Sequence, residues 1–260
     1  MASITALDFL YVAIIAIGLF LDHFALWPAF LRRSLVNPAS ARLWVWPAWM
    51  SMLWALVAAG IVLWLYEART WGALGLVVPH GWRLSSVIGL ALVLVVTYTR
   101  TIAKIARIPY SRRVKLQNQF GKLAAVLPHT RYELGWFVAL SASAGFCEEF
   151  IFRGYLIWVF RSVLGLWGAA AISVIVFAAA HAYQGARGVL TSGVVGILLT
   201  LVVLISESLL PAIALHALID IGQGFVAWLV FRKVQGEGDT VAALPRKSES
   251  TLEMSRRPTP

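Results

Sequence analysis

The sequence predicts an all-α membrane protein, a polytopic helical bundle of about seven transmembrane helices with a polar site inside the membrane. Of its 260 residues, 60% are hydrophobic and only 13% are charged. In a typical soluble domain, about half of the residues are hydrophobic and about a quarter are charged. The hydrophobic residues also occur in long blocks, which favours helices in lipid over one large soluble core.

Seven blocks are long enough to cross a membrane, because a spanning helix needs about 17–25 predominantly apolar residues. Tryptophans lie mostly near the ends of these blocks, where indole rings prefer the headgroup region. We assign residues 1–233 to one transmembrane domain and the polar, charged segment 234–260 to a disordered tail. The predicted spans are about 6–30, 44–66, 84–102, 134–160, 166–184, 188–205 and 209–231.

The basic residues predict the orientation of the chain. Of the 22 Lys and Arg residues, 18 fall on one side of these seven spans, three fall on the other, and Arg153 lies inside a span. Loops rich in Lys and Arg stay on the cytoplasmic side. We therefore expect an inner or plasma membrane protein with its N-terminus outside and its C-terminus in the cytoplasm. The net charge of +10 then reflects orientation rather than nucleic-acid binding, and a single cysteine excludes an internal disulfide framework.

Charged residues interrupt one span in the stretch "CEEFIFRG", residues 147–154. A charge at the bilayer centre costs about 2.5–3.5 kcal/mol on insertion scales, so such residues usually pair and mark function. Glu149 and Arg153 are four residues apart and share a helix face, which allows an ion pair. Glu148 points about 100° away around the helix and has no obvious local partner. We interpret Glu149 and Arg153 as supporting residues and Glu148 as free for chemistry.

Three further polar residues lie deep in later spans. His181 ends "FAAAH", and His216 and Asp220 share a helix face in "HALID". At 1.5 Å per helical residue, these residues and Glu148 lie about 10–22 Å from the outer ends of their spans. We expect them to meet in one layer, where Glu148 activates water and the histidines bind a metal or stabilise charge. A structural ion pair and proton-coupled transport are the alternatives; isolated histidines elsewhere and Asp22 are interpreted as residues of span ends.

These motifs resemble a known family. "EEFIFR", "FAAAH" and "HALID" are similar to the EExxxR, FxxxH and HxxxN/D signatures of the CPBP intramembrane proteases. This family includes Rce1-like CAAX prenyl proteases and bacterial bacteriocin-processing and self-immunity proteins. The resemblance covers about residues 134–231, the protease-like core, and the three motifs occur in the family's order.

The resemblance implies a role for each residue. Glu148 is expected to be the general base, His181 to help hold the water, and His216 with residue 220 to stabilise the oxyanion. Prenyl proteases carry Asn at this last position. An ionised Asp220 cannot donate a hydrogen bond, so it either orients His216 or donates as a neutral acid.

The resemblance also implies a substrate. We expect an intramembrane endopeptidase that cleaves a membrane-associated or lipidated peptide or protein tail in contact with membrane lipid. The sequence requires no cofactor and leaves a divalent metal such as zinc open, with Glu148, His181 and His216 as candidate ligands. Glu148 cannot easily serve as both ligand and base, so we favour glutamate-activated water. A non-enzymatic scaffold or self-immunity protein is the first rival, and a proton-coupled transporter is the second.

Overall fold

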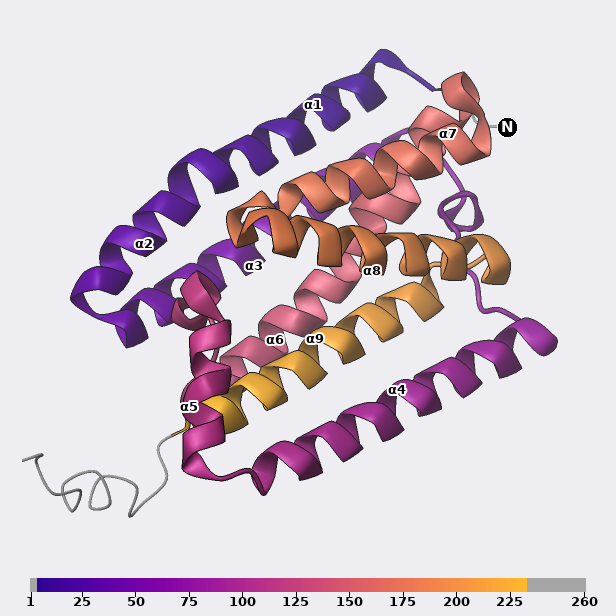
Figure 1. The fold of residues 1–260 in the computed structure, drawn as a ribbon. Coiled ribbons are helices and arrows are strands. Elements are labelled where there is room, and N and C mark those ends of the chain that lie inside the picture. Colours follow the sequence, from indigo (N-terminus) through magenta and orange to yellow (C-terminus); the bar gives the residue numbers. More distant parts are fainter. Residues whose placement is uncertain (1–3, 233–260) are drawn as a thin grey trace, which may run out of the picture.

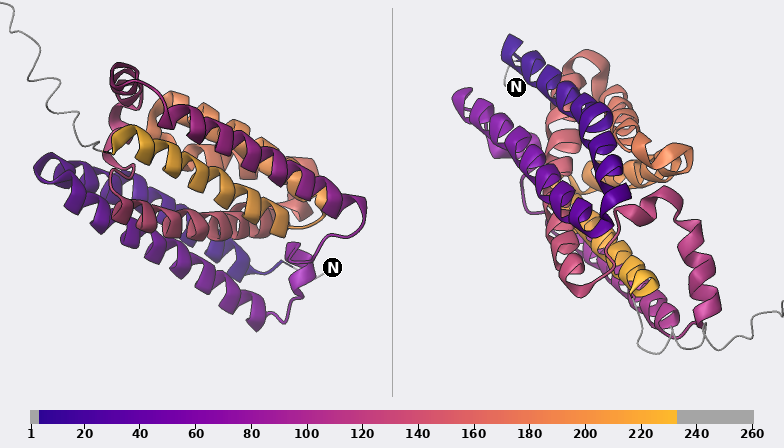
Figure 2. Two further views of the ribbon diagram at one scale, coloured as in Figure 1. Left: turned by 90° about the horizontal axis from the view of Figure 1, so that it is seen from below. Right: turned by 90° about the vertical axis from the view of Figure 1, so that its left-hand side faces the viewer.

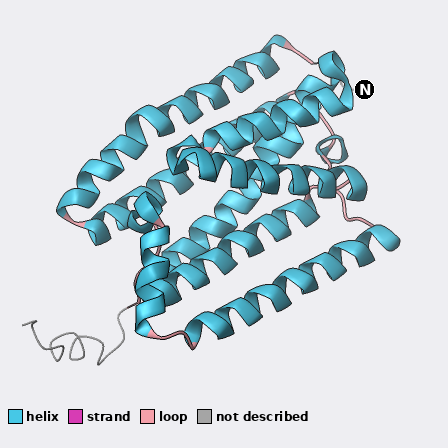
Figure 3. Ribbon diagram, viewed as in Figure 1, coloured by secondary structure: helices cyan, strands magenta, loops and turns pink. Residues whose placement is uncertain are grey.

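The structure is a computed structural model that describes residues 4–232, and all regular secondary structure in that range is helical (Figure 3). The predicted all-α fold class is therefore confirmed. The segment 234–260, predicted to be a tail, lies outside the described residues. The helices are α1 Ala6–Leu21, η1 Asp22–Leu26, α2 Trp27–Val36, α3 Pro38–Tyr66, η2 Trp71–Leu74, α4 Trp82–Ala106, α5 Tyr110–Gln119, η3 Gly121–Ala125, α6 Arg131–Glu148, η4 Glu149–Leu156, α7 Ile157–Ala180, η5 Ala182–Gln184, α8 Gly185–Ser206 and α9 Leu210–Phe231.

The long helices form one bundle, and α5 lies at one end of it (Figure 1 and Figure 2). Among residues 4–232, six continuous helical stretches are long and apolar enough to cross a membrane. The longest, Arg131–Ala180, has 50 residues and is interrupted at Gly165, whose φ of 69° and ψ of 174° are not helical. Such a positive φ suits glycine, which lacks a Cβ. Gly165 therefore divides this stretch in two, which gives the seven spans predicted from the sequence.

The central helix pair, α6 and α9, packs closely at a glycine. A Cβ added to Gly145 of α6 would lie 2.8 Å from the backbone nitrogen and 2.9 Å from the Cβ of Ala217 in α9. The absence of a side chain thus lets the two helices approach, as small residues commonly do in membranes. Glu148 lies on the same α6 helix and His216 immediately precedes Ala217, so this contact also sets the distance between them.

We expect Gly145→Ala to destabilise the protein by about 1–3 kcal/mol, because the added methyl group would force α6 and α9 apart. Gly135→Ala is the matched control, since a Cβ at Gly135 of the same helix meets no atom within 4 Å. Thermal unfolding in detergent would measure both variants. Equal unfolding temperatures for the two variants would contradict the close packing.

A buried ion pair fastens the end of the bundle where α1 begins. Arg69 donates from Nη1 to Asp8 Oδ1 at 2.6 Å and from Nη2 to Oδ2 at 2.8 Å. The hydroxyl of Tyr155 in η4 also donates to Asp8 Oδ1. Asp8 is fully buried. This cluster ties α1, the α3–α4 connection and η4 together, and the sequence analysis did not identify it.

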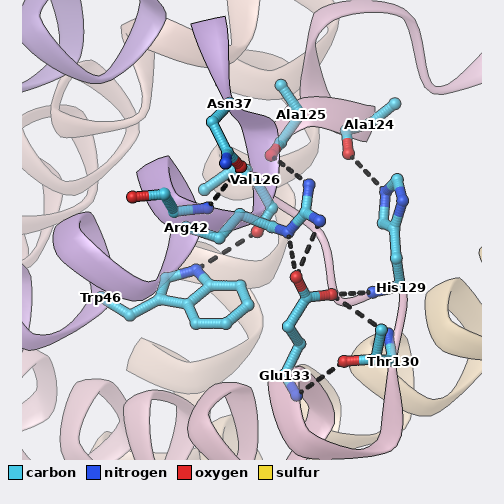
Figure 4. Close-up of polar contacts among 10 residues, drawn as sticks. Asn37, Arg42, Trp46, Ala124, Ala125, Val126, His129, Thr130 and Glu133 are labelled. Atoms are coloured by element: carbon cyan, nitrogen blue, oxygen red, sulfur yellow. Dashed lines mark hydrogen bonds and ion pairs between the residues drawn. The ribbon is translucent and has the colours of Figure 1, made fainter. Parts of the chain in front are cut away.

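A second ion pair fastens the end where α6 begins (Figure 4). Arg42 of α3 donates from Nε and Nη2 to Glu133 Oε1 at 2.9 Å and 2.7 Å. Glu133 also caps α6, because its Oε2 accepts the Thr130 backbone N–H while the Thr130 hydroxyl accepts the Glu133 N–H. The pair therefore fixes α3 against the first turn of α6.

Three consecutive carbonyls before α6 are also held by side chains (Figure 4). His129 Nε2 lies 3.0 Å from the oxygen of residue 124, Arg42 Nη1 lies 3.3 Å from that of residue 125, and Trp46 Nε1 lies 3.2 Å from that of residue 126. The His129 ring also stacks on Phe231, with centroids 4.5 Å apart. His129, interpreted from the sequence as a residue of a span end, is thus part of the packing that positions the segment before α6.

Candidate active site

The helices enclose a cavity of about 470 Å³. Its wall contains residues of α1, α3, α4, α6, α7, α8 and α9, together with the segment 120–127 described above. The four residues predicted to be catalytic all line this cavity: Glu148, His181, His216 and Asp220.

Glu148 is the last residue of α6, directly before the π-helical segment η4. Its Oε2 atom is buried and has no hydrogen-bond partner among the described residues. The same atom lies 3.9 Å from His216 Nε2, which is beyond hydrogen-bond distance. A carboxylate oxygen that is buried at a cavity without a protein donor is available to accept a hydrogen bond from water or substrate.

Glu149 lies in a different environment from Glu148. Its Oε1 accepts hydrogen bonds from Arg153 Nη1 at 2.7 Å and from His216 Nδ1 at 2.8 Å. Arg153 also donates from Nη2 to the carbonyl of Gly196 at 3.1 Å and from Nε to the hydroxyl of Thr200 at 3.3 Å. The ion pair anticipated from the four-residue spacing is present, and through it Glu149 links η4 to α8 and to His216.

The contact between Glu149 and His216 was not predicted. The sequence analysis gave His216 the nearby Asp220 as its carboxylate partner. In the structure, Nδ1 bonds to Glu149 instead, and Nε2 lies 3.6 Å from Asp220 Oδ2 and 3.9 Å from Glu148 Oε2. His216 is therefore fixed through one ring nitrogen and presents the other between two carboxyl groups.

His181 is oriented by its own helix. Its Nδ1 lies 2.8 Å from the carbonyl oxygen of Phe177, which can only accept, so Nδ1 carries the proton. In the neutral ring, Nε2 is then a hydrogen-bond acceptor. The Phe177 ring packs near both histidines, with its centroid 4.7 Å from that of His181 and 5.9 Å from that of His216. Both histidines thus use Nδ1 for anchoring and keep Nε2 for the site.

The side chains as placed do not form the metal site that the sequence left open. Within residues 4–232, no three His, Cys, Asp or Glu side chains are close enough together to hold one ion. Glu148, His181 and His216, the candidate ligands, are therefore not assembled as a three-ligand set. Metal dependence stays a prediction, and no step below is routed through a metal.

The structure adds Asp22 to the cavity, where the sequence analysis interpreted it as a charge of a helix end. Asp22 begins η1, a π-helical segment within the first span, and its Oδ1 accepts a hydrogen bond from Trp49 Nε1 at 2.6 Å. Asp22 and Trp49 both line the cavity. A signal was present in the sequence, because a carboxylate inside a span is a functional candidate by default.

Residues 130–222 match the family model described as "Type II CAAX prenyl endopeptidase Rce1-like". The matched segment contains all seven residues that the three motifs specify, from Glu148 to Asp220. Neither a curated protein nor a solved structure matches the chain significantly. The match at residues 130–222 identifies an Rce1-like domain and supports assigning this part of the chain to the CPBP/Rce1-like family.

Proposed function

We propose that this protein is an intramembrane endopeptidase that hydrolyses a peptide bond in a membrane-associated peptide or protein tail. The observation that carries the proposal is the placement of Glu148, a cavity-lining carboxylate whose buried Oε2 has no protein partner among the described residues. The Oε2 of its neighbour Glu149 also has no partner among the described residues, but Glu149 is not part of the cavity lining and its Oε1 is held by two donors. The two adjacent glutamates therefore suit different tasks, one chemical and one structural.

Glu148 acts as the general base in this proposal. It takes a proton from a water molecule, which His181 Nε2 helps to hold, and the water oxygen attacks the carbonyl carbon of the substrate. The resulting oxyanion is stabilised by a hydrogen-bond donor at the site. When the tetrahedral intermediate collapses, the carbon–nitrogen bond breaks and Glu148 returns its proton to the leaving amine. The active site is regenerated after each cycle without a further reactant.

The oxyanion donor is either His216 or Asp220, and Asp220→Asn separates the two cases. If Asp220 is ionised and supports a protonated His216, the variant should lose about 10–100-fold in activity, as supporting groups of this kind do. If Asp220 is neutral and itself donates, Asn replaces it with little loss. The measurement is the rate of cleavage as a function of pH. We favour the ionised form, since Oδ2 lies 3.6 Å from His216 Nε2.

The function is tested with purified protein in detergent and synthetic tail peptides, supplied with and without a prenyl group. Mass spectrometry identifies the products, and a chelator arm followed by zinc addition tests metal dependence. We expect an internal peptide bond to be cleaved by the wild type and not by Glu148→Ala. A folded wild-type protein that leaves every peptide intact, with and without zinc, would favour the non-enzymatic scaffold or self-immunity protein.

We further propose that the basic loops face the cytoplasm, because 18 of 22 basic residues lie on one side of the seven spans. Substrate tails that enter from the cytoplasm would then meet the segment 120–127, which lines the cavity at that end. Cysteines introduced into residues 100–119 after removal of Cys147 report the orientation. Their labelling by an impermeant thiol reagent from outside intact cells would contradict this arrangement.

A further inference from the structure

The carboxylate of Asp22 has no Lys, Arg or His side chain within ion-pair distance in the described part of the protein. Within residues 4–232, it accepts a hydrogen bond from the indole N–H of Trp49 and forms no ion pair. The other two carboxyl groups of the cavity wall, those of Glu148 and Asp220, each lie within 4 Å of His216 Nε2. Among residues 4–232, Asp22 is therefore the carboxyl group of the cavity wall that has no basic side chain within 4 Å, which leaves it able to pair with a basic group of a ligand.

The cavity as a whole favours a cation. Its described lining contains three carboxyl groups and two imidazoles, but no Lys and no Arg. A negative charge in a span is costly unless it is compensated, and an excess of carboxyl groups over basic groups in a wall raises the local concentration of positive charge. The wall thus provides the electrostatic complement of a basic group.

Aromatic rings stand beside Asp22. Trp49 and Tyr183 both line the cavity, and their ring centroids are 6.0 Å apart. Ammonium and guanidinium groups are attracted to the faces of such rings, most strongly where water is excluded. A carboxylate together with two aromatic rings is a suitable receptor for the end of a Lys or Arg side chain, while the rings also hold its aliphatic part.

Tyr183 relates this carboxylate and its two aromatic rings to the proposed catalytic residues. Its ring stacks on that of His181, and the two ring centroids are 6.1 Å apart. An extended peptide advances about 3.3–3.6 Å per residue, so this separation corresponds to about two residues. A basic side chain bound here would belong to the same peptide segment that contains the scissile bond.

We infer that Asp22, Trp49 and Tyr183 form a subsite that binds a Lys or Arg side chain of the substrate, within about two residues of the cleaved bond. The inference rests on the proposed endopeptidase function for its biological meaning. The subsite itself is a matter of binding, which allows a test that does not depend on cleavage.

The test measures binding to the Glu148→Gln variant, in which the proposed base is removed, so that a bound peptide stays intact. The probes are two blocked pentapeptides, acetyl-Ala-Phe-Lys-Phe-Ala-amide and the same peptide with norleucine in place of Lys. We expect the Lys peptide to bind at least about tenfold more tightly, because the two differ only in the ammonium group. Equal affinity, or no binding of either peptide at millimolar concentration, would overturn the subsite.

Variants at position 22 assign the difference to one carboxylate. Asp22→Asn, added to Glu148→Gln, keeps an oxygen that can accept the indole N–H of Trp49 and removes only the charge. We expect it to abolish the preference for Lys, whereas Asp22→Glu should retain most of it. Thermal unfolding shows whether each variant is folded. A preference that survives Asp22→Asn in folded protein would contradict the assignment.

Cleavage assays with the wild-type protein distinguish the proposed subsite from the proposed endopeptidase function. Equal kcat/KM values for prenylated tail peptides with Lys or norleucine near the scissile bond would remove the subsite and leave the endopeptidase intact. A binding preference that depends on Asp22, found in a protein that cleaves no peptide, would support the subsite and contradict the endopeptidase function.

Discussion

Glu148→Gln is expected to reduce peptide cleavage by about 10²–10⁴-fold, the range that a positioned general base contributes. Gln has nearly the same shape as Glu but cannot take a proton from water at neutral pH. The unfolding temperature should stay close to that of the wild type, because the buried Oε2 of Glu148 has no protein partner among the described residues that the change would release.

Single-turnover measurements give the rate of cleavage, and thermal unfolding in the same detergent gives the unfolding temperature. The control is Gln223→Glu, which leaves Glu148 unchanged and adds a carboxyl group elsewhere on the cavity wall. Glu148→Gln protein that turns over at a near-normal rate would show that another group activates the water.

Glu149→Gln is expected to destabilise the protein by about 3–5 kcal/mol, the cost of removing one partner from a buried ion pair. Glu149 is fully buried, and its loss as a carboxylate leaves Arg153, also buried, without its counter-charge. Cleavage should fall as well, because Glu149 Oε1 fixes the His216 ring through Nδ1. The two neighbouring glutamates would then differ in kind, since Glu149→Gln changes folding and Glu148→Gln changes chemistry alone.

The matched control is Glu207→Gln, which breaks a Glu–Arg pair of similar length. Glu207 Oε2 lies 2.6 Å from Arg83 Nη1, but the Glu207 side chain is 67% exposed. The nearby guanidinium lowers the pKa of Glu207. Exposed pairs of this kind contribute little to stability, so the unfolding temperature should hardly change. Similar decreases in unfolding temperature for Glu149→Gln and Glu207→Gln would show that the buried Glu149–Arg153 pair stabilises the protein no more than the exposed pair does.

The spans could be predicted because each depends on a local property, a block of apolar residues long enough to cross lipid. The separation of two spans near residue 165 could likewise be predicted, and the positive φ of Gly165 supplies its physical basis. The three motifs could be found for the same reason, since charges and imidazoles inside apolar blocks stand out. What these features share is that neighbouring residues determine them.

The partners of the site residues could not be predicted in this way. Glu149 and His216 are 67 residues apart, and Asp8 and Tyr155 are 147 residues apart, so their contacts depend on how helices pack. The expected phase of the helix around Glu148 assumed 3.6 residues per turn, whereas Glu149–Leu156 is π-helical. A local pattern contains no information on such a change of pitch.

The cavity wall is encoded in two parts of the chain. The residues assigned to hydrolysis lie between 130 and 222, whereas Asp22, Trp49 and Tyr98 of the same wall come from helices that precede this segment. Under the proposed function, mutations in the preceding helices would alter which peptides enter without changing the proposed catalytic groups. Chimeras that exchange residues 4–66 between proteins with Rce1-like domains should transfer the contribution of Asp22 and Trp49 to substrate choice, while Tyr183 and the residues proposed for hydrolysis stay those of the recipient.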